Sequence, residues 1–374
     1  MSRWNDSRGD LRWRAVARFA REGWLNWLLL LLPVSWLLEL LRLPAVWVFT
    51  ASALAIIPLA GLLGEATEEL AHWVGPGVGG ILNATLGNAT ELIIGFFALA
   101  AGLQQVVKAS ITGSIIGNIL LVLGLAMLMG GWGRERQTFS RTHAGANSAM
   151  LFLAVVALVM PAVLDLVVFG SLEPTAPLVE LLSLLVAVVL ILTYMGSLIF
   201  SLRTHRILLS SVPEEPRRPR LSLVESLIVL TIATAAVAIE SEILVGTITE
   251  ATATLGLTEF FVGVVVVAVV GNAAEHSAAV LMAIRNRMEL AVTIATGSST
   301  QVALFVAPVL VFTSFLLGQP MSLVFNGLEI VGIGLSVVAL AFVVYDGESN
   351  WFEGLQLVAV YLVLALAFYF VPAA

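Results

Sequence analysis

Long apolar runs dominate this chain of 374 residues and limit what it can fold into. A helix needs about 20 apolar residues to cross the hydrocarbon core of a bilayer. Runs of about that length recur from one end of the chain to the other. Only 11% of the residues are charged, whereas a soluble domain carries about 25%. A large soluble helical core would need more charged surface than this, so the sequence predicts an all-α, multi-pass membrane protein.

We predict eleven transmembrane helices, arranged as one extra helix followed by two repeats of five. The predicted spans lie at residues 25–41, 44–63, 76–102, 107–130, 144–163, 177–201, 223–246, 257–283, 290–317, 323–344 and 352–372. The predicted divisions are an Arg-rich cytoplasmic amino terminus at 1–24, the extra helix at 25–41, the first repeat at 44–201, a polar cytoplasmic linker at 202–222 and the second repeat at 223–372.

The positions of the basic residues predict the orientation of the chain. With eleven spans and a cytoplasmic amino terminus, sixteen of the eighteen Lys and Arg residues lie in the cytoplasm, and only Arg42 and Lys108 face the other side. Positive charge is retained on the cytoplasmic side of a membrane. We therefore expect a cytoplasmic amino terminus and a carboxyl terminus on the opposite side. Either the plasma (inner) membrane or an acidic-organelle membrane fits this prediction.

An internal repeat relates the two halves. A shift of 184 residues lays the segment "GNAAE" at 271–275 on "GNATE" at 87–91, and "TGS" at 296–298 on "TGS" at 112–114. The predicted topology runs the third span outward and the eighth inward, so the two repeats are inverted. Inverted repeats with interrupted helices and a site near the midplane are typical of secondary transporters.

Glu91 and Glu275 are acidic residues deep inside predicted spans. An ionised carboxylate at that depth is unfavourable by several kcal/mol unless it is paired, hydrated or protonated. No Lys or Arg lies at a similar depth in any predicted span. The remaining interpretations are a bound cation, a bound proton or both in turn, against the alternative of permanently neutral structural glutamates. We favour a functional site, because intramembrane acids usually have a function.

Other oxygen donors accompany each glutamate. Asn88 and Asn272 each lie three residues before their glutamate, on the same helical face. Gly87 and Gly271 precede them, where a helix can open and free main-chain carbonyls, although glycines also serve close helix packing. The chain has no cysteine, so the donors are oxygens. Such a set favours a hard cation, and Ca2+ more than Mg2+, which keeps its waters.

The two motifs resemble those of a known family. "LGNATELI" and "VGNAAEHS" resemble the signature motifs of the Ca2+/H+ antiporters, the cation/proton exchanger branch of the Ca2+/cation antiporter superfamily, and the likeness includes "PLAGLLGEATEELA", "GSIIGNILLVLG" and "GSSTQVALFVAPVL". The resemblance implies that Glu91 and Glu275, with carbonyls around Asn88 and Asn272, bind Ca2+ and protons in turn. It also implies a polar ion path, made here by Ser114, Asn118, Ser298 and Gln301.

Elementary electrostatics leads to the same mechanism. Two carboxylates in one site repel each other when it is empty, so protons bind when Ca2+ leaves. If the protein changes its facing only when the site is neutralised, Ca2+ leaves the cytoplasm in exchange for protons. Ca2+ and H+ are then transported ions, and we expect no cofactor, no nucleic acid and no obligate protein partner besides the lipid bilayer.

Three other functions are alternatives to Ca2+/H+ exchange. An antiporter of the same fold for Mn2+ or Na+ stays open, because selectivity depends on fine ligand placement. A cation channel is less favoured, because two glutamates of one chain form no ring of subunits. An enzyme is not expected, because the chain shows neither a nucleophile with a base at helical spacing nor a zinc motif.

His276 and Glu329 are weaker candidates. His276 follows Glu275, and neighbouring helical residues point about 100° apart, so we expect it to tune the proton path rather than to bind the metal. Glu329 lies near the outer end of its predicted span, where we expect a structural hydrogen bond.

Two groups of acids lie near the predicted span ends. Glu65, Glu68 and Glu69 stand at the cytoplasmic end of the second span, and Glu240 and Glu242 near the outer end of the seventh. Each group either collects cations at an entrance or is a solvated surface, and the sequence leaves both interpretations open.

Overall fold

The computed structural model of the chain describes residues 24–170, 172, 177–201 and 219–372. These residues are almost entirely helical. Seven helices among them are long and apolar enough to cross a membrane, or up to nine if each of two bent helix pairs is one span. The predictions for residues 1–23 and 202–218 lie outside the described part of the chain.

The elements of the first half are η1 (Trp24–Leu30), α2 (Leu31–Leu40), α3 (Ala45–Val74), α4 (Pro76–Leu86), α5 (Ala89–Ala100), α6 (Gln104–Ile116), η2 (Gly117–Val122), α7 (Leu123–Gly131), β1 (Gln137–Thr138), α8 (Arg141–Phe169) and α9 (Pro177–Ile199). Those of the second half are α11 (Leu223–Leu255), α12 (Glu259–Phe261), η4 (Val262–Val267), α13 (Ala268–Gly271), α14 (Ala273–Ile284), α15 (Met288–Gln301), η5 (Val302–Val306), α16 (Ala307–Leu316), α17 (Gly327–Val343), β2 (Glu348–Ser349) and α18 (Trp351–Tyr369).

The predicted all-α membrane fold is confirmed, and the total of eleven spans stays a prediction. The two remaining predicted spans, 25–41 and 323–344, correspond to shorter apolar helices at Asn26–Leu40 and Gly327–Val343. The helices α3 and α11 run well past the span ends expected at 63 and 246. Hydropathy marks only the apolar part of a helix, whereas backbone hydrogen bonding continues through the polar turns that follow.

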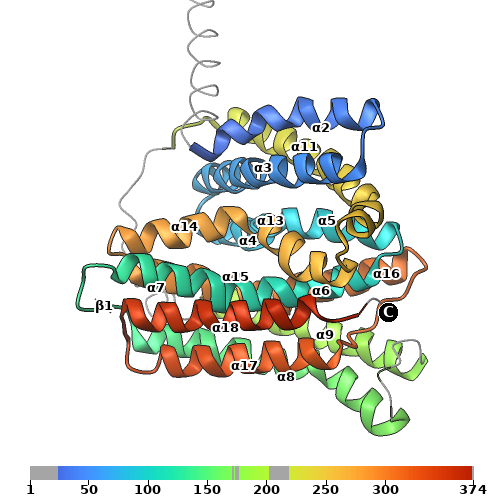
Figure 1. The fold of residues 1–374 in the computed structure, drawn as a ribbon. Coiled ribbons are helices and arrows are strands. Elements are labelled where there is room, and N and C mark those ends of the chain that lie inside the picture. Colours follow the sequence, from blue (N-terminus) through green and yellow to red (C-terminus); the bar gives the residue numbers. More distant parts are fainter. Residues whose placement is uncertain (1–23, 171, 173–176, 202–218, 373–374) are drawn as a thin grey trace, which may run out of the picture.

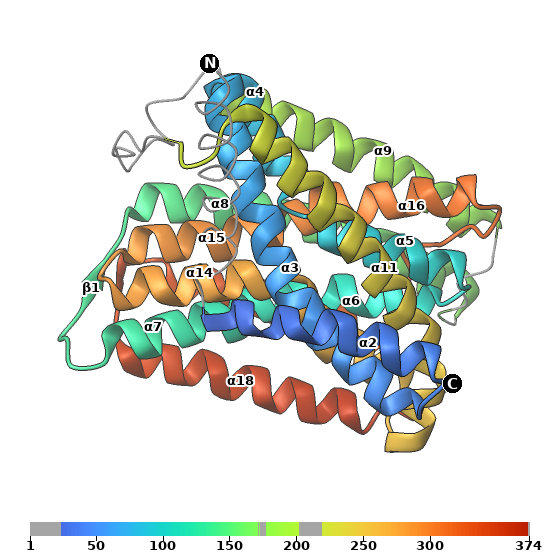
Figure 2. The same cartoon turned by 90° about the horizontal axis from the view of Figure 1, so that it is seen from above.

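The helices pack in layers. In Figure 1, α2, α3 and α11 lie together along one side, and α8, α17 and α18 lie toward the opposite side, with the broken helices and α6, α7, α15 and α16 between. Figure 2 shows α3 and α11 crossing over the middle layer. The buried face of α3 is rich in alanine and serine, including Ala51, Ser52, Ala53 and Ala55. Small side chains let helix backbones approach closely within a membrane.

The structure supports the predicted inverted repeat. Under the 184-residue shift α5 coincides with α14, and α6 with α15 to within one residue. Each of α6 and α15 continues into a π-helical segment, η2 and η5, at matching positions. In Figure 1, α5 and α14 lead away from the middle of the molecule toward opposite ends.

Buried polar contacts hold α6 to the start of α17. Glu329 Oε1 accepts a hydrogen bond from Thr112 Oγ1 at 2.9 Å, and its Oε2 accepts one from the backbone N–H of Asn326 at 2.8 Å. Lys108 Nζ donates to the carbonyl of Val324 at 3.0 Å. The expected structural hydrogen bond of Glu329 is therefore confirmed.

Among the glycines of the described residues, Gly113 has the tightest surroundings. A Cβ at this position would lie 1.9 Å from the carbonyl oxygen of Val264 and 2.7 Å from Ala268 Cβ. Gly297, its counterpart in the repeat, has nothing within 4 Å of the same position. The absence of a side chain is thus required in α6 and is not required in α15.

We expect Gly113→Ala to lower the stability of the folded protein by about 1–3 kcal/mol, because the added methyl group must push η4 away from α6. Thermal unfolding of the detergent-solubilised protein, followed by size-exclusion chromatography, measures the effect. Gly297→Ala is the matched control and should unfold near the wild-type temperature. Equal shifts for both variants would contradict the assigned contact.

Candidate ion-binding site

Two helices are broken at the asparagines of the repeated motif. The α4–α5 pair bends by 41° and the pair that ends in α14 bends by 62°. Asn88 and Asn272 leave the helical conformation (φ −100° and −96°), whereas Gly87 keeps it (φ −55°, ψ −34°) and Gly271 ends α13. We expected the breaks at the glycines. They lie one residue later, at Asn88 and Asn272.

The asparagine side chains explain the position of the breaks. Asn272 Nδ2 donates to the carbonyl of Ala268 at 2.9 Å, and Asn88 Nδ2 lies 3.4 Å from the carbonyl of Ala84. Each amide therefore approaches a carbonyl four residues earlier. Asparagine competes with the backbone in this way and disfavours an uninterrupted helix.

The breaks bring the two glutamates together. Glu91 and Glu275 stand in the first turns of α5 and α14. A Cβ on Gly271, four residues before Glu275, would lie 3.3 Å from Glu91 Cγ. Gly271 therefore serves close packing, by making room for the glutamate of the other half. The amino-terminal ends of both half-helices add positive potential near these carboxyl groups.

Three oxygen atoms of the motif are buried without a hydrogen-bond donor. They are Glu91 Oε2, Glu275 Oε2 and Asn88 Oδ1, and no group in the described ranges donates to them. A buried acceptor without a partner is unfavourable by about 1–3 kcal/mol. A cation or a proton supplies what these atoms lack. Oxygen donors of this kind suit a hard cation such as Ca2+.

The polar residues expected along the ion path all contact the two motifs. Ser114 accepts from Asn272 Nδ2 at 2.9 Å, and Gln301 Oε1 accepts from Asn88 Nδ2 at 2.6 Å. Asn118 Nδ2 donates to Ser298 Oγ at 2.9 Å. These contacts join α6, η2 and α15 to the helix breaks.

The two motifs are not equivalent. Asn272 Oδ1 lies 3.4 Å from Ser298 Oγ and 3.5 Å from Asn118 Nδ2, whereas Asn88 Oδ1 accepts nothing from the described residues. The repeat explains the difference, because Val302 occupies the position equivalent to Asn118. Asn272 is thus held in a network, and the oxygen of Asn88 is left for a ligand.

His276 belongs to the same network. Its Nε2 lies 3.0 Å from Asn118 Oδ1. An amide oxygen only accepts, so Nε2 carries the hydrogen and donates it. This contact occupies the nitrogen that would otherwise be offered to a metal, and the expected role of His276 in tuning the proton path stays a prediction.

The acids at the end of α3 differ among themselves. Glu69 Oε2 accepts hydrogen bonds from the backbone N–H groups of Arg220 at 2.7 Å and Leu221 at 3.1 Å. Glu69 thus fastens the segment that leads into α11. Glu65 and Glu68 are exposed, so the proposal of a cation-collecting surface concerns these two.

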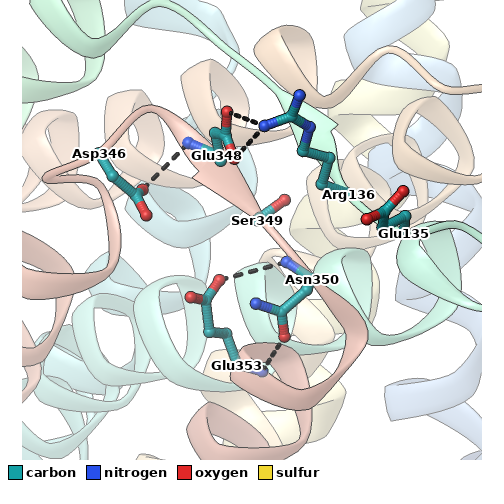
Figure 3. Close-up of a pocket in the computed structure, with 7 residues that line it drawn as sticks. All are labelled: Glu135, Arg136, Asp346, Glu348, Ser349, Asn350 and Glu353. Carbon is teal, nitrogen blue, oxygen red and sulfur yellow. Dashed lines mark hydrogen bonds and ion pairs between the residues drawn. The ribbon is translucent and has the colours of Figure 1, made fainter.

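A second acidic region lies at the β1–β2 pair and is distinct from the glutamate site. Figure 3 shows a pocket lined by Glu135, Arg136, Asp346, Glu348, Ser349, Asn350 and Glu353. Arg136 Nη1 pairs with Glu348 at 2.8 Å, and Glu353 Oε2 accepts from the backbone N–H of Asn350 at 3.2 Å (Figure 3). Asp346 Oδ1 also accepts from the backbone N–H of Glu348 at 3.0 Å (Figure 3). Three of the carboxylates are therefore engaged, and no group of three or more metal-ligating acids or histidines occurs among the described residues.

Sequence analysis missed Tyr194. Its hydroxyl donates to the carbonyl of Ala84 at 2.9 Å, which is the carbonyl that the break at Asn88 leaves without a helical partner. A lone tyrosine in an apolar span was the available signal, but a single polar aromatic has many structural uses.

The comparisons with known proteins identify the class of protein. The family model described as sodium/calcium exchanger protein matches residues 44–203 and 225–370. The chain belongs to this family, which confirms the superfamily that the motifs indicated, and it is an integral membrane protein.

Several relatives are similar over nearly the whole chain. A Ca(2+)/H(+) antiporter of Aphanothece halophytica is 47% identical over 360 residues, covering 92% of this chain and 96% of the relative. The Ca(2+)/H(+) antiporter ChaA of Bacillus subtilis is 43% identical and covers 90% of this chain and 96% of the relative. The solved structure of native YfkE matches with a TM-score of 0.78 at 40% identity, covering 91% of this chain and 97% of that one. The H+/Ca2+ exchanger CAX shares the fold at 16% identity, with a TM-score of 0.68 and coverage of 92% and 91%.

We expect Tyr194→Phe to lower stability by about 1 kcal/mol, because the Ala84 carbonyl loses its strong donor inside the membrane. Tyr361→Phe is the matched control: Tyr361 is also buried, and none of the hydrogen bonds of the described residues uses its hydroxyl. Thermal unfolding of both variants measures the difference. A loss for Tyr361→Phe as large as that for Tyr194→Phe would contradict the role of this hydrogen bond.

Proposed function

We propose that this protein exchanges cytoplasmic Ca2+ for protons by alternating access, with Glu91 and Glu275 binding Ca2+ or H+ in turn. The observation that carries the proposal is the group of buried, donor-free oxygens of Glu91, Glu275 and Asn88. The Ca(2+)/H(+) antiporters among the relatives support the same function.

The chemistry of the site favours a doubly charged cation. Two carboxylates carry two negative charges, and one Ca2+ or two protons neutralise them equally. Because each half-helix supplies one carboxylate, the neutral state also removes the repulsion between α5 and α14. Ca2+ accepts irregular sets of six to eight oxygens, including waters and amide oxygens.

The architecture suits alternating access of the site to the two sides of the membrane. The half-helices α5 and α14 begin beside the site and lead toward opposite ends of the molecule (Figure 1). A rearrangement of α3 and α11, which cross over this middle layer (Figure 2), opens the site to one side or the other. With an inward proton gradient and a cytoplasmic amino terminus, the net result is expulsion of Ca2+. An exchanger for Mn2+ or Na+ is the alternative, and a channel is less favoured.

We expect Glu91→Gln and Glu275→Gln each to abolish Ca2+ uptake driven by a pH gradient in inverted or reconstituted vesicles. An amide keeps the size of the side chain but neither takes up a proton nor carries the charge that holds Ca2+. Glu348→Gln, which alters only an exposed ion pair of small energetic value, should transport normally. Replacing Ca2+ by Mn2+ or Na+ in the same vesicles decides among the cations. Uptake that survives in either site variant, or that ignores the pH gradient, would refute the proposal.

Ca2+ binding to the purified protein should strengthen as the pH rises, since protons and Ca2+ compete for the same carboxylates. If one Ca2+ displaces two protons, the logarithm of the affinity rises by about 2 per pH unit through the competing range. In Glu91→Gln, where residual binding is measurable, the slope falls to about 1. Isothermal titration calorimetry in buffers of different ionisation enthalpy measures the released protons directly. A pH-independent affinity would exclude the competition.

A further inference from the structure

Glu240 on α11 is a buried carboxyl group outside the ion path. Its side chain and that of Ser35 on α2 are both 0% exposed. Sequence analysis placed Glu240 near the outer end of the seventh span, either at an entrance or on a solvated surface, and its complete burial contradicts both interpretations. The helix α11 continues to Leu255, so Glu240 lies in its middle part, under α2.

Ser35 is the hydrogen-bond partner of Glu240. Ser35 Oγ lies 2.9 Å from the carbonyl oxygen of Leu32 and 2.7 Å from Glu240 Oε1. A serine hydroxyl has one hydrogen and can donate only once. Either Ser35 donates to Glu240, or Ser35 donates to Leu32 and a protonated Glu240 donates to Ser35. In the second arrangement Glu240 carries a proton on Oε1.

The surroundings of Glu240 favour the arrangement in which its carboxyl group is protonated. Its Oε2 is buried and accepts no hydrogen bond from the described residues, although the Trp36 indole lies close to the carboxyl group. An unpartnered oxygen is tolerable on a neutral acid and far more costly on an ionised one.

No cation compensates Glu240 in the described part of the chain. The titratable groups on the helices packed around it are Glu39 on α2; Glu65, Glu68, Glu69 and His72 on α3; Glu91 on α5; and Glu225, Glu242 and Glu250 on α11. His72 lies at the far end of α3 and bonds to the carbonyl of Glu68, and the exposed Arg42 lies beyond α2. The ion pairs of the described residues include neither of them.

The position of this contact connects it to the ion site. One turn away, Leu59 and Leu63 of α3 and Val237 of α11 form an apolar cluster with Leu32 of α2 and Ile93 of α5. Ile93 lies two residues after Glu91. The Ser35–Glu240 contact therefore fixes α2 beside the cluster that covers the first turn of α5.

We propose that Glu240 is a third, permanently occupied proton site, and that its hydrogen bond to Ser35 fastens α2 to the α3–α11 pair so that the three helices move as one body during transport. Glu240 is a positioning residue in this scheme, since it contacts no transported ion. The proton stays on Oε1 throughout the cycle, whereas the protons on Glu91 and Glu275 exchange with Ca2+.

Infrared spectroscopy of the full-length protein tests the protonation directly. At about pH 8, where a hydrated glutamate is ionised, the Ca2+-loaded protein should show a carboxylic-acid C=O band that shifts in D2O and disappears in Glu240→Gln. Glu348→Gln, the exposed control, should keep this band. An unchanged spectrum in Glu240→Gln would overturn the proposal. This measurement does not depend on the transported ion, so it stands even if the proposed function fails.

Transport separates Glu240 from the ion site. A glutamine donates to Ser35 as a protonated glutamate does, so Glu240→Gln should transport within about twofold of wild type. Ser35→Ala and Glu240→Ala, which remove the hydrogen bond, should lower transport roughly three- to tenfold. Loss of transport in Glu240→Gln as complete as in Glu91→Gln would show that an exchangeable charge is needed, and the proposal would fail.

The movement of α2 with α11 has its own test. The chain contains no cysteine, so Ser35→Cys combined with Glu240→Cys creates a single possible disulfide. Mass spectrometry verifies its formation. If the helices move together, transport in the oxidised form should be at least as high as in the reduced form, which lacks the hydrogen bond between the two positions. Transport that stops on oxidation and returns on reduction would show that they separate during the cycle.

Discussion

The arrangement of this protein depends on one constraint: polar atoms inside the membrane-spanning part need a partner from the protein itself, because lipid supplies none. Breaking a helix frees backbone groups, and the chain satisfies them locally. At the first break Tyr194 donates to the freed carbonyl of Ala84. At the second, the carbonyl of Ala268 keeps the backbone N–H of Asn272 at 3.2 Å and also accepts from Asn272 Nδ2 at 2.9 Å. The breaks can therefore remain inside the membrane, and the buried oxygens without a hydrogen-bond partner include those of Glu91, Glu275 and Asn88, which we assign to the transported ion.

The differences between the repeats are as informative as their likeness. The 184-residue shift matches α5 with α14 and η2 with η5, so the backbone around the site is nearly the same in both halves. The side chains are not: Asn118 has no polar counterpart, and it holds Asn272 and His276 in place. One half thus presents a fixed motif and the other an amide oxygen without a donor. An ion that binds between them contacts one rigid and one less constrained wall.

Much of the site could be predicted from sequence because the repeat is visible there. Glu91 and Glu275 were paired by the shift, and the path residues around them lie in hydrogen-bond contact with the motifs. The predictions that failed concerned the depth of Glu240 and the residue at which the helices break. Glu240 was placed near a helix end because hydropathy ends before the helix does. The break was placed at glycine, where steric freedom is greatest, although the asparagine side chain decides its position. Tyr194 and Glu69 act on backbone groups of distant segments, and no local pattern reveals such contacts.

Buried carboxyl groups in this chain therefore fall into different physical situations that burial alone does not separate. Glu329 accepts hydrogen bonds on both oxygens, from Thr112 and Asn326, so its position is explained without a ligand. Glu91 and Glu275 face each other, and each has an oxygen without a donor. They cannot both be ionised without a cation between them. Glu240 has Ser35 as its hydrogen-bond partner on Oε1, and its Oε2 has no hydrogen-bond partner among the described residues. Counting donors and acceptors around each group separates a structural cap, an ion site and a fixed proton, where a search for intramembrane acids would class all of them as ion ligands.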